Sequence, residues 1–374
     1  MNAEIKIEKI LETESISQYN KWVKKNKERY PGLMPMYFKV EMINNMKKYK
    51  IQYFNEEGNL LKEEFVEGEN INVYTDERNR IFIRKRNNGG TTIEVKDKFG
   101  NSLFVVKNIG SLFYLPKNLY IGEPPIEEDV TESPYLLIFN GKGELIKILE
   151  LKGCVDFSTI RIPTDSSYTL LRIVGGKDET ILMIDSNGNE VWRRKFVGTH
   201  FVPFISKDGS KIGLNFYLNK KIEVYNKNGE FEYIYEISEK EGSSLYNSSF
   251  SLNGSYLITG TNYIIYFYDN NTHELIWRKT IKERPKKFDF VLGDNYILVA
   301  YLSNDIHFYD KRGNLIGSFK IPLRESESFK KVFTEEGVKF MKKIKPEWKW
   351  DIEFIEPLII IKSMGKIFIY EIKI

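Results

Sequence analysis

The stretch ILMIDSNGNEVWRRKF at residues 181–196 decides the fold of this chain. Its first strand is an apolar run, the turn DSNGN supplies a glycine, and a second run of mixed residues follows; in other copies, such as TIEVKD at 92–97, apolar and polar residues alternate. Alternation is typical of a strand with one buried face, and Asp or Asn shortly before Gly is typical of a tight hairpin. The stretch is therefore predicted to be a β-hairpin.

The same hairpin recurs along the whole chain at a nearly constant interval. An eighth copy, KIFIYEIKI at 366–374, ends after its first strand, and two further apolar runs joined by a turn lie between consecutive copies. The turn glycines of the first five copies are spaced by 42, 43, 45 and 41 residues, at Gly58, Gly100, Gly143, Gly188 and Gly229. His273 and Gly313 take the same place in the next two copies.

Four strands in each repeat of about 42 residues are the signature of a β-propeller blade. The composition agrees, because the only alanines are Ala3 and Ala300 whereas β-branched and aromatic residues abound. We predict an all-β fold, a single propeller domain that spans residues 1–374. Eight third-strand repeats indicate eight blades, and seven is the alternative because the first unit (36–66) offers only three clear strands.

Two short patterns resemble known propeller repeats. Asp185-x-x-Gly188-x-x-x-Trp192 looks like the hairpin of pyrroloquinoline-quinone-like repeats. Ser-Lys-Asp-Gly at 206–209 and Ser-Leu-Asn-Gly at 251–254 are similar to a turn of WD-repeat propellers. This resemblance implies the fold and no particular activity, because such propellers host very different functions.

The two ends of the chain are expected to share one blade. The last repeat lacks its fourth strand, and an unassigned alternating segment, Glu4–Leu11, precedes the first repeat. We predict that Glu4–Leu11 pairs beside Ile367–Ile372. This pairing would close the propeller ring and protect an otherwise exposed strand edge.

Three insertions interrupt the repeat, at residues 12–35, 121–134 and 322–349. The first and third are predicted to contain short helices and to join a fourth strand to the next first strand, whereas the acidic second insertion joins a second strand to a third. In an up-and-down blade both kinds of connection lie on one face, so all three insertions are predicted on the same face. Long loops on a rigid scaffold often carry function, so a site is expected there.

The two helical insertions carry basic residues beside tryptophans, which suggests a surface for a protein partner, an anionic polymer or a membrane face. The plainer interpretation is a solvated helix face opposite an apolar stripe that packs on the propeller. In the first insertion that stripe would be Ile16, Tyr19, Trp22 and Val23. The candidate partner-binding residues are Trp22, Lys25, Arg29, Lys342, Lys343 and Trp348.

A second candidate group lies where first strands are expected to begin, beside the mouth of a central channel. It comprises Asp156, Arg161, His200, Asp289 and Asp351. A buried carboxylate needs water or a cationic partner, and Arg161, expected on the same strand as Asp156, is such a partner. The group suits a small ligand, and the plainer interpretation is a polar, water-lined channel.

No cofactor or metal is predicted. The lone Cys154 excludes an internal disulfide and a multi-cysteine metal site, and turn chemistry explains the Asp- and Asn-rich turns better than calcium binding does. With 56 basic and 52 acidic residues there is no basic field of the kind that nucleic-acid binding needs, so no nucleic-acid partner is expected. No apolar stretch approaches the ~20 residues of a membrane-spanning helix.

The leading hypothesis is a non-enzymatic binding or scaffold propeller that uses the face with the insertions for a protein or other macromolecular partner. The alternative is an enzyme or small-ligand binder at the channel mouth, acting on a sugar, a lactone or a small acid. The first residues show no export signal, which predicts a cytoplasmic protein unless the start Met replaces a removed signal peptide.

Overall fold

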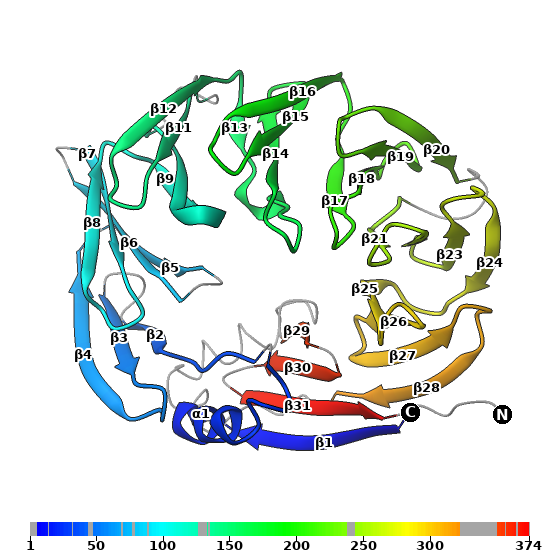
Figure 1. Cartoon of the computed structure of the whole chain (residues 1–374), viewed down its shortest axis with the longest axis horizontal. Helices are drawn as coiled ribbons and strands as arrows, with labels where there is room; N and C mark the ends of the chain where they lie inside the picture. The colour runs from blue at the N-terminus through cyan, green and yellow to red at the C-terminus, as the bar shows by residue number, and fades with distance from the viewer. Residues whose placement is uncertain are drawn as a thin grey trace. The chain divides into compact units, whose positions relative to one another are not determined.

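The computed structural model describes residues 6–13, 15–31, 33–43, 48–68, 70–76, 79–87, 90–125, 133, 135–237, 244–321, 350–355, 357–363 and 366–373. Within these ranges the strands form eight antiparallel sheets, and the fold is an eight-bladed β-propeller (Figure 1). The prediction of eight blades is confirmed. Seven sheets have four strands and the first has three, as the sequence of the first unit indicated.

The chain divides into two compact units of four blades each. One consists of Ser17–Lys25 and Met34–His200, and the other of Met1–Ile16, Asn26–Leu33 and Phe201–Ile374. Blade 1 is the first blade in chain order and blade 8 the last.

Blades 1 to 4 belong to the first unit, and each follows a simple up-and-down order. Blade 1 consists of β2 (Phe38–Ile43), β3 (Lys48–Phe54) and β4 (Leu60–Glu67). Blade 2 consists of β5 (Ile71–Thr75), β6 (Ile81–Asn87), β7 (Gly90–Lys96) and β8 (Ser102–Lys107). Blade 3 consists of β9 (Ser111–Leu115), the 3-10 helix η1 (Pro116–Asn118), β10 (Leu119–Glu123), β11 (Tyr135–Phe139) and β12 (Leu145–Glu150). Blade 4 consists of β13 (Cys154–Val155), the 3-10 helix η2 (Phe157–Thr159), β14 (Tyr168–Gly175), β15 (Asp178–Asp185) and β16 (Glu190–Val197).

Blades 5 to 8 belong to the second unit. Blade 5 consists of β17 (Val202–Ile205), β18 (Lys211–Phe216), β19 (Lys221–Asn226) and β20 (Phe231–Glu236). Blade 6 consists of β21 (Asn247–Phe250), β22 (Tyr256–Gly260), β23 (Ile264–Asp269) and β24 (Leu275–Thr280). Blade 7 consists of β25 (Pro285–Val291), β26 (Tyr296–Tyr301), β27 (Asp305–Asp310) and β28 (Leu315–Lys320). Blade 8 consists of β29 (Trp350–Ile355), β30 (Leu358–Ser363), β31 (Lys366–Lys373) and β1 (Lys6–Thr13).

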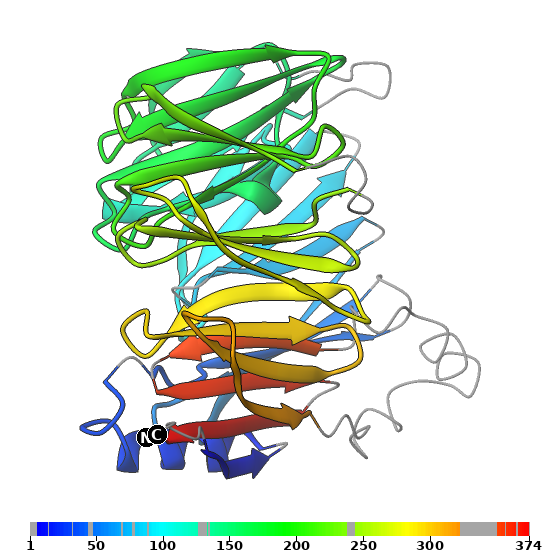
Figure 2. The ribbon, with the colours of Figure 1, turned by 90° about the vertical axis from the view of Figure 1, so that its right-hand side faces the viewer.

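The N-terminal strand completes blade 8, as predicted. β1 pairs antiparallel with β31, from Lys6 opposite Lys373 to Thr13 opposite Ile367, with a bulge before Leu11 (Figures 1 and 2). The ladder covers the edge of β31 that would otherwise be exposed, which is how a propeller closes.

The hairpin turns follow the chemistry expected from their sequences. In the turn between β15 and β16, Asp185 Oδ1 accepts hydrogen bonds from the backbone N–H groups of Asn187 and Asn189, both at 2.8 Å. Gly188 has φ of +79°, a value that L side chains rarely adopt. Burial favours a neutral Asp185, but the hydrogen bonds from Asn189 and Asn187 outweigh it and hold the pKa of this carboxyl below its usual value.

These turn carboxylates are expected to make stability depend on acid pH. The pKa values of Asp97, Asp185 and Asp310 all lie below their usual range, so their stabilising effect is present above the unfolded-state pKa of about 4 and is lost as the pH falls through the folded-state pKa. In blade 3 the same turn is made by Asn140, whose side-chain amide carries no titratable proton in this pH range. The triple variant D97N/D185N/D310N should therefore lose less melting temperature than wild type between pH 5 and pH 2.5. An equal loss in both proteins would contradict the assignment.

The first insertion forms the predicted helix, α1 (Ile16–Lys25). Its buried residues are Tyr19, Asn20 and Val23, whereas Ile16 and Trp22 are only half-buried, so the predicted apolar stripe is shifted toward Asn20. The fully buried Asn20 side chain donates to the carbonyl groups of Met36 at 2.8 Å and Asn55 at 3.2 Å, and accepts from the N–H of Met36 at 2.8 Å. These contacts attach α1 to blade 1.

The connectivity of the insertions is as predicted. α1 lies between β1, a fourth strand, and β2, a first strand, and the acidic insertion joins the second strand β10 to the third strand β11. Residues 126–132 and 134 of the acidic insertion lie outside the described residues, as does the whole of 322–349 with its expected helices. That all three insertions share one face stays a prediction.

Candidate functional site

A buried ion pair occupies one face of blade 4. The register of β14 and β15 sets Arg172 opposite Ile181 and Glu179 opposite Val174, so the two charged residues are diagonal neighbours on the same face. Arg172 Nε donates to Glu179 Oε2 at 2.8 Å and Nη2 to Oε1 at 2.5 Å. The Glu179 side chain is 1% exposed and that of Arg172 12%. The pair is bidentate and almost completely removed from water.

Two predicted site residues join this pair. Arg172 Nη1 lies 3.0 Å from Asp156 Oδ2, and His200 Nδ1 lies 2.6 Å from Glu179 Oε1. The structure thus brings Asp156 and His200 together through Arg172 and Glu179, which the sequence analysis did not identify. The available signal was a charged residue inside each of the apolar runs YTLLRIVG and DETILMID.

The expected pairing of Asp156 with Arg161 is corrected. β13 ends at Val155, and Asp156 then caps η2 by accepting a hydrogen bond from Ser158 N–H, so Arg161 is not on the same strand. The ion-pair partner of Asp156 is Arg172. Arg161 donates instead to the carbonyl of Ile160 at 2.9 Å, and burial lowers the pKa of its guanidinium against the opposing effect of Asp156.

A further buried carboxylate, Glu123 at the end of β10, contacts the same region. Its Oε1 accepts a hydrogen bond from the N–H of Val155 at 2.5 Å, one residue before Asp156, and Ser111 Oγ donates to Oε2 at 3.4 Å. Burial raises the pKa of Glu123. The hydrogen bonds from Val155 and Ser111 lower it, but by less than burial raises it. The residue lies in the predicted acidic insertion, but sequence alone gave no sign that it would be buried.

The chemistry of this cluster favours structure over catalysis. Asp156 and Glu179 already have the Arg172 guanidinium as a shared cationic partner, which is what buried carboxylates need. Within the described part of the chain, no group of three or more His, Cys, Asp or Glu side chains is placed to hold a metal ion.

The other channel-mouth candidates lie in the second unit. Asp289 is the fifth residue of β25 and pairs with Leu298, so it lies toward the turn between the first two strands rather than where the first strand begins, as was expected. Its Oδ1 is 3.5 Å from Lys207 Nζ and accepts from the N–H of Phe290 at 2.9 Å. Asp351 lies at the start of β29 as predicted, and its side chain is outside the described part of the structure.

The exposed face of α1 is basic. Lys24 is paired with Glu57 at 2.7 Å. Lys21 and Lys25, one helical turn apart and both exposed, have no ion pair or hydrogen bond among the described residues. Trp22 is half-buried beside them in the helix sequence. α1 therefore presents, from a fixed position on blade 1, two charges that no described residue neutralises.

Arg29, also predicted to bind a partner, has an intramolecular role. Its guanidinium forms an ion pair with Glu371 of β31, and Tyr30 Oη donates to the same carboxylate oxygen at 2.7 Å. Burial favours a neutral Glu371, but Tyr30 and Arg29 outweigh it and hold the pKa of the carboxyl below its usual value. Lys342, Lys343 and Trp348 lie outside the described residues.

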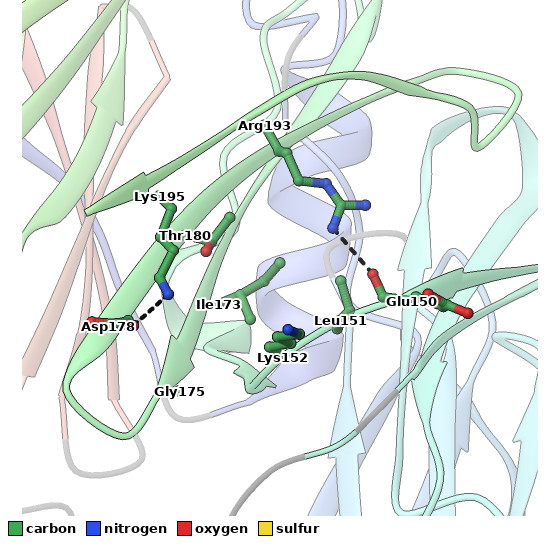
Figure 3. Close-up of a pocket in the computed structure, with 9 residues that line it drawn as sticks. All are labelled: Glu150, Leu151, Lys152, Ile173, Gly175, Asp178, Thr180, Arg193 and Lys195. Atoms are coloured by element: carbon green, nitrogen blue, oxygen red, sulfur yellow. Dashed lines mark hydrogen bonds and ion pairs between the residues drawn. The ribbon is translucent and has the colours of Figure 1, made fainter. Parts of the chain in front are cut away.

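A cavity of about 560 Å³, which we call the interblade pocket, lies between blades 3 and 4 (Figure 3). Blade 3 and the connection that follows it contribute one wall, and β14, β15 and β16 contribute the other. The pocket is lined by Glu150, Leu151, Lys152, Ile173, Gly175, Asp178, Thr180, Arg193 and Lys195. None of these residues was a site candidate from the sequence, because the repeat pattern does not show which side chains of neighbouring blades leave space between them.

Comparisons with known proteins find likeness in fold but not in sequence. No protein-family model and no curated protein matches the chain. Its structure is similar to BamB from Moraxella catarrhalis (TM-score 0.51, 11% identity, covering 89% of this chain and 96% of that one). It is also similar to the C-terminal WD40 domain of Sif2 (0.52, 11%, covering 90% and 93%) and to a eukaryotic initiation factor (0.54, 12%, covering 77% and 79%).

At these identities the comparisons establish the propeller fold alone. They agree with the WD-repeat and quinone-like repeat resemblance seen in the sequence. Among the described residues no helix is both long and apolar enough to cross a membrane.

Proposed function

We propose that this protein is a non-enzymatic binding propeller and that the exposed face of α1 contacts a protein partner. Propellers of the WD40 and BamB type commonly act as protein-interaction scaffolds, which supports the general class. The observation that carries the proposal is that α1 holds two exposed lysines in a fixed position. The helix is fixed to blade 1 by the buried Asn20 and presents Lys21 and Lys25, neither of which has a neutralising partner among the described residues.

The charge of this face defines the partner it would suit. Two exposed lysines one turn apart attract a surface with exposed carboxylates, and electrostatic complementarity of this kind accelerates association and selects partners. Trp22 supplies an aromatic side chain of the type that is enriched in interfaces. We therefore propose an acidic protein surface as the partner. Lys342, Lys343 and Trp348 remain part of the proposed surface on their sequence pattern, and separate substitutions test them.

Site-specific photo-crosslinking tests the proposal. A photoreactive amino acid at position 25 should give a discrete crosslinked protein in cells that contain the partner, whereas the same group at exposed position 142, in the hairpin turn of blade 3, should not. The double variant Lys21→Glu/Lys25→Glu should reduce capture of that protein about tenfold or more, because repulsion replaces attraction at two contacts.

The result that would contradict the proposal is equally specific. If position 25 gives no crosslinked protein, or if the double variant captures the same protein as well as wild type does, the α1 face is not the binding surface. Thermal unfolding of the double variant serves as the control, since neither lysine has an ion pair to lose among the described residues.

The alternative, a small-ligand or enzymatic function at the channel mouth, has less support. Of the predicted channel-mouth residues, the structure brings Asp156 and His200 together. Asp156 already forms an ion pair with Arg172, and His200 already contacts Glu179. A thermal shift with a sugar, lactone or small acid that is lost in Asp289→Asn/Asp351→Asn would favour this alternative.

A further inference from the structure

We propose that the interblade pocket is a binding site for a small organic anion with an aliphatic part, recognised by Lys152 and Thr180. This inference is independent of the α1 face, because the pocket lies between blades 3 and 4 and neither residue belongs to the first insertion. Its volume of about 560 Å³ falls in the range of known small-molecule sites, roughly 300 to 1,000 Å³.

Beside the pocket, the connection that follows blade 3 packs backbone against backbone on the end of β14. A Cβ added to Gly153 would lie 2.5 Å from the carbonyl oxygen of Val174, and one added to Gly175 would overlap the carbonyl oxygen of Lys152. Only glycine at both positions lets the two backbones approach this closely. The connection after blade 3 is thereby fixed to β14 at the start of the β13–β14 pairing of blade 4, so the position of Lys152 relative to blade 4 is set by backbone rather than by flexible side chains.

The floor of the pocket is apolar and firmly packed. Leu151 and Ile173 line it, and both belong to the hydrophobic cluster that joins blades 3 and 4, where they are 5% and 2% exposed. A floor of this kind favours an aliphatic group over a fully hydrated ion, since burying such a group against it removes apolar surface from water.

Two of the cations around the pocket are already neutralised. Lys195 Nζ lies 2.5 Å from Asp178 Oδ2. Arg193 forms a bidentate pair with Glu190 and donates from Nη1 to the carbonyl of Glu150 at 3.2 Å (Figure 3). These contacts hold Arg193 and Lys195 in place at the rim, where they still add a positive potential to the site.

Two polar groups in the pocket remain uncommitted. The Lys152 ammonium and the Thr180 hydroxyl make no hydrogen bond or ion pair among the described residues. Thr180 lies opposite Ile173 on the neighbouring strand, Lys152 is exposed on the facing wall, and Figure 3 shows the Glu150 side chain directed away from Thr180. A free ammonium and a hydroxyl above an apolar floor are the groups that bind a carboxylate attached to an aliphatic chain.

The charge balance argues against a cationic ligand. The lining carries Lys152, Arg193 and Lys195 against Glu150 and Asp178, and Asp178 is neutralised by Lys195. A cation entering the pocket would meet the Lys152 ammonium, while the one lining carboxylate without an ion pair among the described residues, that of Glu150, is directed away from Thr180 (Figure 3). An anion would instead be attracted by the Lys152 ammonium and by the positive potential of Arg193 and Lys195.

Hexanoate is a suitable probe, with hexanamide as its neutral counterpart and acetate as an anion that lacks the aliphatic part. In saturation-transfer NMR and calorimetric titration of the full chain, hexanoate should bind saturably, and hexanamide and acetate should each bind about tenfold more weakly or not at all. Lys152→Gln should weaken hexanoate about tenfold or more, because a charge-assisted hydrogen bond is lost. Thr180→Val should weaken it by a smaller factor.

The matched control is Lys142→Gln, an exposed lysine of blade 3 that does not line the pocket and should leave hexanoate binding unchanged. The proposal is overturned if hexanoate does not bind saturably, if hexanamide binds equally well, or if Lys152→Gln binds like wild type. Thermal unfolding of each variant verifies that the fold is retained.

Discussion

Replacing Glu179 with alanine is expected to lower the free energy of unfolding by about 3 to 5 kcal/mol, the largest effect we predict for a single substitution. The reason is the Arg172 guanidinium, which is only 12% exposed and would lose its buried bidentate partner, keeping only the ion pair with Asp156, whose side chain is 25% exposed. The measurement is the denaturant midpoint of full-length wild type and variant, followed by tryptophan fluorescence.

A second ion pair in the same blade provides the matched control. Arg193 and Glu190 also form a bidentate pair, but their side chains are 42% and 30% exposed. Glu190→Ala should cost about 1 kcal/mol or less, because water and salt screen an exposed pair. Equal effects at Glu179 and Glu190 would show that burial does not determine the contribution of the Arg172 pair.

Removing both partners should be less harmful than removing one. In Arg172→Met/Glu179→Leu neither member of the bidentate pair is left without the other, and apolar groups fill a similar volume; only Asp156, whose side chain is 25% exposed, loses its ion-pair partner. We expect this double variant to be more stable than Glu179→Ala. If it is less stable, the pair contributes more than the avoidance of an unpaired charge, and the contacts to Asp156 and His200 become the explanation to examine.

Asn20→Ala is expected to detach α1 from blade 1 and to cost about 2 to 4 kcal/mol. Three hydrogen bonds disappear, each worth about 1 kcal/mol, and the Met36 N–H loses its side-chain partner. Hydrogen exchange is the sharpest measurement, because the amides of α1 should exchange much faster while those of blades 2 and 3 are unchanged.

The control for Asn20 is Lys21→Ala, one residue along the same helix but exposed. It should leave both stability and α1 exchange close to wild type. Slow exchange of α1 in Asn20→Ala would contradict an anchoring role for this side chain. Since the proposed function needs α1 in a fixed position, Asn20→Ala should also weaken partner capture without changing any exposed charge.

The fold was accessible from sequence because the hairpin is local. Alternation and turn residues act within about fifteen positions, and the copy at 181–196 contains both strands and their turn. Repetition then predicted eight blades, and the unassigned strand at each end of the chain predicted the pairing of β1 with β31. Helix α1 was also predicted from its local pattern, although the burial of Asn20 was not.

For the site, the sequence indicated some of the residues but not their partners. Asp156 and His200 drew attention as polar residues in apolar surroundings, but Arg172 and Glu179 meet only through the register of β14 and β15, and Asp156 therefore pairs with Arg172 rather than Arg161. Asp289 was placed at the wrong end of its strand, because a repeat pattern locates strands better than their boundaries.

By itself the sequence determined the blade, its number of copies and the closing strand, since hydrophobic periodicity and turn chemistry are properties of neighbouring residues. Only the tertiary structure decided which charges are buried together and where space remains between blades. The first depends on strand register within a sheet, as the Arg172–Glu179 pair illustrates, and the second on how two sheets pack, as the space beside Lys152 between blades 3 and 4 illustrates. Contacts between strands that are distant in sequence leave no period in the chain.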